Sequence, residues 1–251
     1  MKAIILAAGE GSRLRPYTHD RPKCLVKVAG VSLIDRQISI LQSCGIDEVV
    51  VIGGYRSEML EGKGTRLRTN DRYAETNMVW TLFCAEEELS GEVIVSYGDI
   101  VYSGKILEAL LKCKSDIAVT IDTDWENYWR ARSDDPLQDA ESLKLTKEGS
   151  IYEIGRKPKS IDEIEGQYMG LMKFTAKGLE VLSSTFKDGC EKGSMLDKKP
   201  ENAYMTDLLM EIVNQGGKIK SVPIRHPWIE IDTTEDLESE VTLERIKSIE
   251  G

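Results

Sequence analysis

A glycine-containing segment near the N-terminus carries the residue types that bind phosphate. Gly9, Gly11 and Arg13 stand in Gly-x-Gly-x-Arg spacing directly after an apolar stretch, and Lys23 follows further along the chain. Glycines allow backbone N–H groups to approach a phosphate chain without a Cβ in the way. Arg13 can place its planar fork on phosphate oxygens, and Lys23 adds a compact second cation. We therefore expect a phosphate-binding loop with two cations. Its loop residues are Gly9, Glu10, Gly11 and Ser12.

The spacing of this loop differs from two common nucleotide-binding loops. The dinucleotide-binding fingerprint needs a third glycine, in Gly-x-Gly-x-x-Gly, and the P-loop needs Gly-Lys-Ser/Thr. Residues 6–14 contain neither pattern. A dinucleotide-dependent oxidoreductase is therefore disfavoured.

Two aspartates stand where predicted strands end. Asp99 follows the apolar run at residues 93–95, and Asp232 follows the run at residues 228–231. Carboxylates at the phosphate-binding edge of a sheet are the usual hard-oxygen ligands of Mg²⁺, which keeps other positions for water and substrate phosphate. Each aspartate alone is also typical of a turn or a helix cap. The pair predicts a Mg²⁺ site formed by Asp99 and Asp232.

The first half of the chain alternates strand patterns with helical patterns. Continuous apolar runs, typical of strands buried on both faces, occupy residues 3–6, 49–52, 93–95 and 117–121. Apolar residues at helical spacing occupy residues 33–44, 79–89 and 106–111. This order predicts an α/β fold with a Rossmann-like, mixed but mostly parallel sheet and helices on both faces. Ligands bind such sheets at the carboxyl ends of the strands.

The second half predicts a smaller, more antiparallel lobe. A hairpin is indicated by two short apolar runs around a turn at residues 147–149. Residues 188–202 are rich in Lys, Gly and Asp and are expected to form a mobile loop. A final charged helix is expected to begin near Glu235. Further strands are expected at residues 168–174, 219–222 and 228–231, and one further helix is expected at residues 208–213.

The composition limits the classes of partner. The formal net charge is −10, from 43 acidic and 33 basic residues, which argues against nucleic acid because phosphate backbones need a basic face. No apolar run approaches the roughly 20 residues of a membrane span, so we expect no membrane partner. Five scattered cysteines without metal-ligand spacing are typical of reduced thiols, and we expect a cytoplasmic protein.

The phosphate loop and the two aspartates resemble motifs of the nucleoside triphosphate transferase superfamily. The match rests on Leu6-Ala7-Ala8-Gly9-Glu10-Gly11-Ser12-Arg13-Leu14, Arg21-Pro22-Lys23, Tyr97-Gly98-Asp99 and Ile231-Asp232-Thr233. The resemblance implies a GT-A-like variant of the α/β fold, with Asp99 and Asp232 as metal ligands. It further implies that the base and ribose of the nucleotide lie near Ala7, Ala8, Gly53, Tyr73, Asn77 and Gly98.

Finer features resemble one group within that superfamily. Residues 75–82 resemble the Asn-containing segment of bacterial phosphocholine cytidylyltransferases. Several short segments between residues 122 and 141, with residues 166–171 and 228–232, resemble enzymes that make CMP-linked phosphonates and CMP-phosphoglutamine. No segment resembles the sugar-binding part of the longer, sugar-specific members. The resemblance implies CTP as one substrate and a small phosphate or phosphonate acceptor as the other.

Aromatic and charged residues that follow the strand at residues 117–121 are candidates for acceptor binding. Aromatic rings beside carboxylates could hold an ammonium group through cation–π and ionic contacts, and Arg130 or Arg132 could hold the acceptor's phosphate or phosphonate. The alternative is an ordinary surface helix in which Trp125 and Trp129 pack at positions i and i+4. The candidates are Asp122, Asp124, Trp125, Tyr128, Trp129, Arg130, Arg132, Gln167, Tyr168 and Glu230.

These residues, together with what the resemblance implies about the nucleotide, predict a Mg²⁺-dependent cytidylyltransferase. It transfers CMP from CTP to a small phosphorylated alcohol or amide, or to a phosphonate, and releases pyrophosphate. An acceptor phosphate oxygen is already anionic near neutral pH, so catalysis needs positioning and charge neutralisation rather than a general base. His19 and His226 are therefore expected to have no catalytic role.

The expected organisation is one domain over residues 1–251. It consists of a nucleotide-binding half, residues 1–121, and an acceptor-binding half, residues 122–251, with the second metal aspartate. A homodimer is compatible with the sequence. Two alternatives stay open: a sugar-1-phosphate or inositol-phosphate nucleotidyltransferase, and a non-catalytic nucleotide-binding regulatory subunit.

Overall fold

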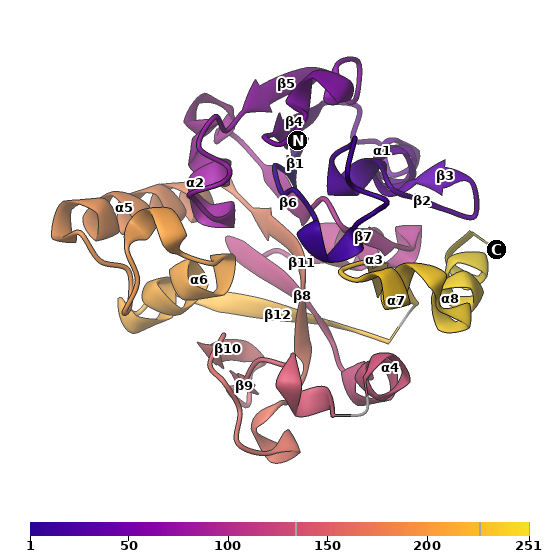
Figure 1. The fold of residues 1–251 in the computed structure, drawn as a ribbon. Helices are drawn as coiled ribbons and strands as arrows, with labels where there is room; N and C mark the ends of the chain where they lie inside the picture. Colours follow the sequence, from indigo (N-terminus) through magenta and orange to yellow (C-terminus); the bar gives the residue numbers. More distant parts are fainter. Residues whose placement is uncertain (134, 226, 251) are drawn as a thin grey trace.

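A mixed, mostly parallel sheet forms the centre of the molecule. The computed structural model describes residues 1–133, 135–225 and 227–250, and over these residues nine strands join in one sheet (Figure 1). In spatial order the strands are β5 (Arg66–Thr69), β4 (Val49–Gly53), β1 (Lys2–Ala7), β6 (Val93–Tyr97), β11 (Gln167–Phe174), β8 (Ile117–Asp122), β12 (Ile219–Ile224), β10 (Ser150–Ile154) and β9 (Leu143–Leu145). The first four strands are mutually parallel, β11 runs antiparallel between β6 and β8, and β9 and β10 form the predicted hairpin. The predicted α/β class is confirmed.

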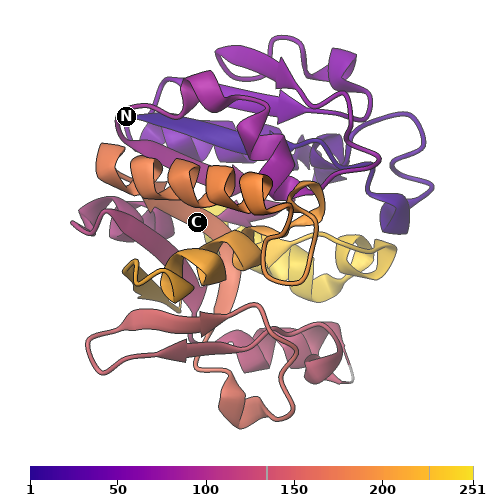
Figure 2. The same cartoon turned by 90° about the vertical axis from the view of Figure 1, so that its left-hand side faces the viewer.

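Helices cover both faces of this sheet because its central strands are apolar on both sides. One face packs against α1 (Leu33–Ser43) and α3 (Gly104–Lys112). The other face packs against α2 (Met78–Phe83), α5 (Ala176–Lys192) and α6 (Met205–Asn214). Figure 2 shows α5 and α6 side by side in front of the sheet. Strands buried in this way read as continuous apolar runs, which is why β1, β4, β6 and β8 stand out in the sequence.

A short antiparallel pair joins the two halves of the chain beside the sheet. The strand β7 (Ile100–Tyr102) follows β6 after a tight turn, and it pairs with β13 (Trp228–Glu230). The pairing sets Glu230 opposite Ile100, and the N–H of Ile231 donates to the carbonyl of Asp99 over 3.1 Å. The carboxyl end of β6 is thereby tied to the carboxyl end of β13. A second short pair, β2 (Lys27–Val28) with β3 (Val31–Ser32), leads into α1.

Three predicted elements are wrong in extent. The expected loop over residues 188–202 begins inside α5, because Leu179, Leu182 and Phe186 supply a buried face at helical spacing and the charged residues lie on its outer face. The helix expected over residues 79–89 ends at Phe83, and a separate short 3₁₀ turn spans Glu86–Glu88. The final helix is divided at Ser239 into α7 (Thr234–Glu238) and α8 (Glu240–Glu250).

No helix within the described ranges combines the length and the apolarity that crossing a bilayer requires.

The buried side chain of Glu88 holds the short 3₁₀ turn that follows α2. Its buried carboxylate receives Lys2 Nζ at 3.1 Å, Arg66 NH2 at 2.9 Å and Arg68 NH2 at 2.7 Å. Burial acts to raise the pKa of Glu88, but the hydrogen bonds from Arg66 and Lys2 outweigh burial and hold this pKa below its ordinary value. Charged hydrogen bonds therefore fasten β1 and β5 to the turn after α2.

We expect the variant Glu88→Gln to lose about 2–3 kcal/mol of free energy of unfolding at pH 7, since it loses charge-assisted bonds to a buried group. A carboxyl whose folded-state pKa is lowered stabilises the fold above its unfolded-state pKa, and this contribution disappears as pH falls through the folded-state value. The difference between the variant and the wild type should therefore shrink on acidification. Urea unfolding of both proteins at neutral and acidic pH measures this difference in free energy of unfolding. A difference that is absent at pH 7, or that grows in acid, would contradict the assignment.

Candidate active site

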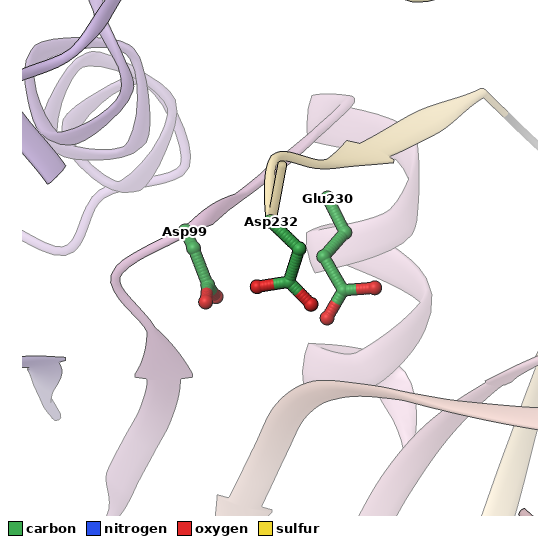
Figure 3. Close-up of side chains that lie close together, drawn as sticks. All are labelled: Asp99, Glu230 and Asp232. Carbon is green, nitrogen blue, oxygen red and sulfur yellow. The ribbon is translucent and has the colours of Figure 1, made fainter. Parts of the chain in front are cut away.

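Three carboxylates meet at the carboxyl edge of the sheet. Asp99 lies in the turn between β6 and β7, Glu230 is the last residue of β13, and Asp232 follows shortly after it. One oxygen of each carboxylate lies within 4.8 Å of the others. Figure 3 shows Asp232 between the other two side chains, with all three carboxylates directed into a common space. The β7–β13 pairing produces this meeting, because it aligns the turn that carries Asp99 with the strand end that carries Glu230.

Two cations approach the aspartates from the N-terminal loop. Lys23 Nζ lies 2.6 Å from Asp99 Oδ2 and also contacts Asp232 Oδ1, and Arg13 NH2 lies 3.3 Å from Asp232 Oδ2. Burial would lower the pKa of Lys23, but the charges of Asp99 and Asp232 hold it above its ordinary value. Burial would raise the pKa of Asp232, but Lys23 holds it below its ordinary value. The predicted residues Arg13, Lys23, Asp99 and Asp232 thus lie together.

Glu230 differs electrostatically from the two aspartates. Burial, followed by the negative charge of Asp232, raises the pKa of Glu230 to about 8, although Arg132 acts in the opposite direction. The sequence suggested Glu230 for acceptor binding, whereas the structure places it beside the proposed metal ligands. The missed signal is the spacing in Glu230-Ile231-Asp232, because residues two apart on an extended strand point to one side.

The donor set suits a hard divalent cation. All three side chains offer carboxylate oxygens, which are the ligands that Mg²⁺ prefers. Asp99 Oδ1 is buried and has no hydrogen-bond partner among the described residues. An unsatisfied buried acceptor costs free energy, so this oxygen is available for a metal ion. The residues therefore fit the predicted metal site.

The glycines of the N-terminal loop have two different roles. Gly11 has a positive φ of 63°, and a Cβ there would lie 2.9 Å from the Cβ of Lys23, so glycine allows Lys23 to approach the loop. A Cβ on Gly9 would meet nothing within 4 Å in the part of the chain that the structure describes. Gly9 thus borders open space. Ser12 begins a short 3₁₀ turn, and Glu10 is paired with Arg15 at 3.3 Å.

A cavity of about 150 Å³ lies beside Gly9 and Asp99. It is lined by six of the residues predicted for nucleotide or metal binding: Ala8, Gly9, Tyr73, Asn77, Gly98 and Asp99. Its other lining residues lie in motif segments of the sequence but were not predicted to bind the nucleotide: Leu6, Thr76, Met78, Thr81 and Tyr97. Thr76 and Thr81 could have been found from their places around Asn77, one before it and one helical turn after it. We refer to this space as the loop cavity.

Close backbone packing shapes the loop cavity. A Cβ on Gly98 would lie 2.7 Å from the carbonyl oxygen of Leu6, so only glycine lets the β6–β7 turn lie against β1. Ala7 is buried inside β1, and Gly53 faces Ser57 and Leu60. These two predicted nucleotide-binding residues therefore do not line the cavity.

A second cavity, of about 390 Å³, has Asp232 in its wall. It is lined by Arg13, Trp129, Arg132, Ser133, Gln138, Asp139, Asp232, Thr233, Glu235 and Asp236. We call it the Asp232 cavity. Two of the predicted acceptor-binding residues, Trp129 and Arg132, form part of its wall.

The aromatic residues of α4 (Trp125–Arg132) are mostly covered by protein groups. Trp125, Tyr128 and Trp129 are buried, and Tyr128 packs edge-on against Trp129 and Trp228 with ring centroids 5.6 and 5.5 Å apart. The cation nearest the Tyr128 ring is the chain's own Arg245, at 3.8 Å. The expected ammonium cage is therefore filled from within. Trp125 and Trp129 do pack against each other at i and i+4, as the alternative predicted, with ring centroids 6.2 Å apart, but both side chains are buried.

The other predicted acceptor-binding residues have contacts outside the cluster of three carboxylates. Asp122 is buried and accepts a hydrogen bond from Trp228 Nε1 at 2.8 Å, and with Asp124 it lines a separate cavity of about 350 Å³. Arg130 is exposed and pairs with Glu126 at 2.7 Å. The side-chain amide of Gln167 donates a hydrogen bond to the carbonyl of Glu141 and accepts one from its N–H. Tyr168 packs against Tyr97, a wall residue of the loop cavity, with ring centroids 5.7 Å apart.

His19 lies outside the cluster formed by Arg13, Lys23, Asp99, Glu230 and Asp232. His19 is exposed, and its backbone carbonyl accepts a hydrogen bond from Tyr55 Oη at 2.8 Å. The prediction for His226 lies outside the described residues.

Residues 3–155 match the family described as MobA-like NTP transferase domain. The chain belongs to this family. One relative aligns over nearly its full length: the CTP:phosphoglutamine cytidylyltransferase of Campylobacter jejuni is 40% identical over 96% of this chain and 99% of its own length. The choline-phosphate cytidylyltransferase of Streptococcus pneumoniae is 42% identical over 41% of this chain and 46% of its own. The resemblance to nucleoside triphosphate transferases is confirmed.

A solved structure extends the family likeness to the fold. The inositol-1-phosphate CTP transferase from T. maritima superposes with a TM-score of 0.75 and 23% identity, over 99% of this chain and 96% of that one. The predicted GT-A-like form of the α/β fold is therefore confirmed.

We expect the variant Lys23→Ala to lose about 3 kcal/mol of free energy of unfolding, and so to melt at a lower temperature than the wild type, because it leaves two partly buried carboxylates without their shared cation. A divalent cation can supply the missing charge, so Mg²⁺ should raise the melting temperature of this variant more than that of the wild type. Thermal unfolding in EDTA and in Mg²⁺ measures both effects. Lys27→Ala, which removes an exposed lysine nearby, is the control. Equal Mg²⁺ responses in Lys23→Ala and the wild type would contradict this account.

Proposed function

We propose that this protein is a cytidylyltransferase that transfers CMP from CTP to a small phosphorylated or phosphonate acceptor. The acceptor oxygen forms a bond to the α-phosphorus, the bond from that phosphorus to the bridging oxygen breaks, and pyrophosphate leaves. The observation that carries the proposal is the convergence of Arg13, Lys23, Asp99 and Asp232 between two cavities. Full-length similarity to a CTP-dependent relative supports the choice of nucleotide.

In this proposal the two halves of the chain divide the substrates. The loop cavity, formed within residues 6–99, would hold the nucleotide, with the backbone of Gly9–Ser12 along the phosphates. The Asp232 cavity, formed mostly by residues 129–236 with Arg13, would hold the acceptor. The two sites meet at Asp99 and Asp232, so an acceptor oxygen there would lie beside the α-phosphate.

Charge neutralisation would come from three sources. Arg13 and Lys23 would bind phosphate oxygens and the leaving pyrophosphate, because both reach the point where the cavities meet. Asp99 and Asp232, with Glu230 beside them, would hold Mg²⁺. The metal ion, when bound, would supply positive charge that lowers the repulsion between two anionic substrates.

The acceptor class follows from the relatives together with the Asp232 cavity. The names of two relatives specify phosphoglutamine and choline phosphate as their acceptors. Both acceptors carry nitrogen-containing groups beside a phosphate, and the Asp232 cavity combines Arg13 with the acids Asp139 and Glu235. A cytoplasmic location and a homodimer stay predictions from the sequence.

Pyrophosphate release from a substrate panel tests the proposed function. We expect faster pyrophosphate release with CTP than with ATP, GTP or UTP. We also expect faster release with phosphoglutamine, phosphocholine or 2-aminoethylphosphonate as acceptor than with glucose 1-phosphate or inositol 1-phosphate. Asp99→Asn should lower turnover by at least about a hundredfold, a loss near 2.7 kcal/mol in transition-state stabilisation. Preference for a sugar or inositol phosphate would favour the alternative enzyme. CTP binding without any turnover would favour a regulatory subunit.

Gly9→Ala tests whether the nucleotide phosphates run along the loop. The added methyl group meets no described atom within 4 Å, so we expect an unchanged melting temperature. It does occupy the open side of the loop cavity, and we expect the KM for CTP to rise about tenfold, which corresponds to about 1.4 kcal/mol. Gly104→Ala, whose Cβ would make only an ordinary contact with Cys44 Sγ at 3.9 Å, is the matched control. An unchanged KM in Gly9→Ala would exclude this path for the phosphates.

A further inference from the structure

We propose that Arg132 and Asp236 form a positioning pair that fixes the segment carrying Glu230 and Asp232, and thereby sets the affinity of the site for a divalent cation. This inference rests on the metal site of the proposed function. It gives Arg132 a different role from the acceptor binding that the sequence suggested.

Arg132 directs its three nitrogen atoms at two carboxylates. Its Nε lies 2.8 Å from Asp236 Oδ1, its NH2 lies 3.1 Å from Asp236 Oδ2, and its NH1 lies 3.1 Å from Glu230 Oε2. The Arg132 side chain is only 12% exposed. Two parallel bonds from a guanidinium to one carboxylate fix direction as well as distance. The geometry therefore holds α4, β13 and the start of α7 in one arrangement.

Asp236 passes this arrangement to the backbone of Asp232. Asp236 Oδ2 accepts hydrogen bonds from the N–H of Asp232 and the N–H of Thr233, each over 3.0 Å. Thr233 Oγ1 accepts in return from the N–H of Asp236 over 3.1 Å, which completes the capping box of α7. The backbone turn that aims the Asp232 carboxylate is thus fixed by a side chain that Arg132 holds.

The rest of α4 supports the same segment. Tyr128 Oη accepts a hydrogen bond from the N–H of Glu230 over 3.1 Å, and Trp228 packs against Tyr128 and Trp129. The aromatic residues that resembled a ligand cage therefore form the base on which β13 lies. Groups around metal ligands commonly fix their orientation, and loss of such a group lowers metal affinity about 10–100-fold.

The test compares Arg132→Gln with Arg130→Gln. Arg130 lies on the same helix, is exposed, and pairs only with Glu126 among the described residues, so it is a matched control for charge and helix stability. The probe is Mn²⁺ with CTP and no acceptor, and bound and free Mn²⁺ are distinguished by electron paramagnetic resonance. We expect Mn²⁺ affinity to fall at least about tenfold in Arg132→Gln and to stay near the wild-type value in Arg130→Gln.

Two further variants keep the test decisive if Arg132→Gln does not fold. Arg132→Lys keeps the charge and loses the bidentate fork, and Asp236→Asn keeps an acceptor for the cap and loses the ion pair. Each should weaken Mn²⁺ binding less than Arg132→Gln but clearly more than Arg130→Gln. Thermal unfolding measured alongside separates a loss of stability from a loss of metal affinity.

Three outcomes would overturn the inference. They are wild-type Mn²⁺ affinity in the Arg132 and Asp236 variants, equal losses in the Arg130 control, and a rise in the KM for phosphocholine or phosphoglutamine with unchanged Mn²⁺ affinity. The last outcome would restore Arg132 to acceptor binding. If no substrate pair releases pyrophosphate while Mn²⁺ binding still depends on Arg132, the proposed function fails and the positioning role stands.

Discussion

Repulsion between the neighbouring carboxylates of Asp99 and Asp232 is the constraint on which the arrangement of the site depends. Two like charges about 4 Å apart repel by roughly 4 kcal/mol at the effective dielectric constant near a protein surface. The two aspartates therefore need cations close by, and the third carboxyl group within 4.8 Å, that of Glu230, has its pKa raised to about 8. Lys23 and Arg13 approach from the N-terminal loop, and Arg132 approaches from α4. The site is held by charge pairing across segments that are distant in sequence.

The fold brings these segments together through one short pairing. The main sheet places Asp99 at the carboxyl end of β6, where an α/β sheet binds its ligands. It does not by itself bring Asp232 there, because β13 lies outside that sheet. The antiparallel contact between β7 and β13 accomplishes this, and the capping box at the start of α7 then fixes the turn. Local stability in a few residues thus determines the geometry of the whole site.

The sequence predicts those parts of the site whose signals are local. A glycine turn after an apolar strand and an aspartate after another strand can be recognised within about ten residues, and parallel topology brings such turns to one edge. The role of α4 could not be predicted in this way. Tyr128, Trp129 and Arg132 have residue types suited to a ligand site, but their contacts are with Trp228, Glu230 and Asp236, which lie far along the chain. Residue type indicates what a side chain can bind, and only the fold decides what it does bind.

The exposed fraction of each cationic side chain indicates how readily that side chain can bind a substrate. The Arg13 side chain is 64% exposed, so its contact with Asp232 involves little desolvation and can be exchanged for a phosphate at small cost in free energy. Lys23, 14% exposed, and Arg132, 12% exposed, lie in drier surroundings. Lys23 nevertheless lies between two carboxylates that a divalent cation can neutralise in its place, whereas Arg132 is held by a bidentate pair with Asp236 and has no such replacement. A substrate phosphate should therefore bind Arg13 more readily than Lys23, while Arg132 keeps its contacts with Asp236 and Glu230 and holds the acidic residues in position.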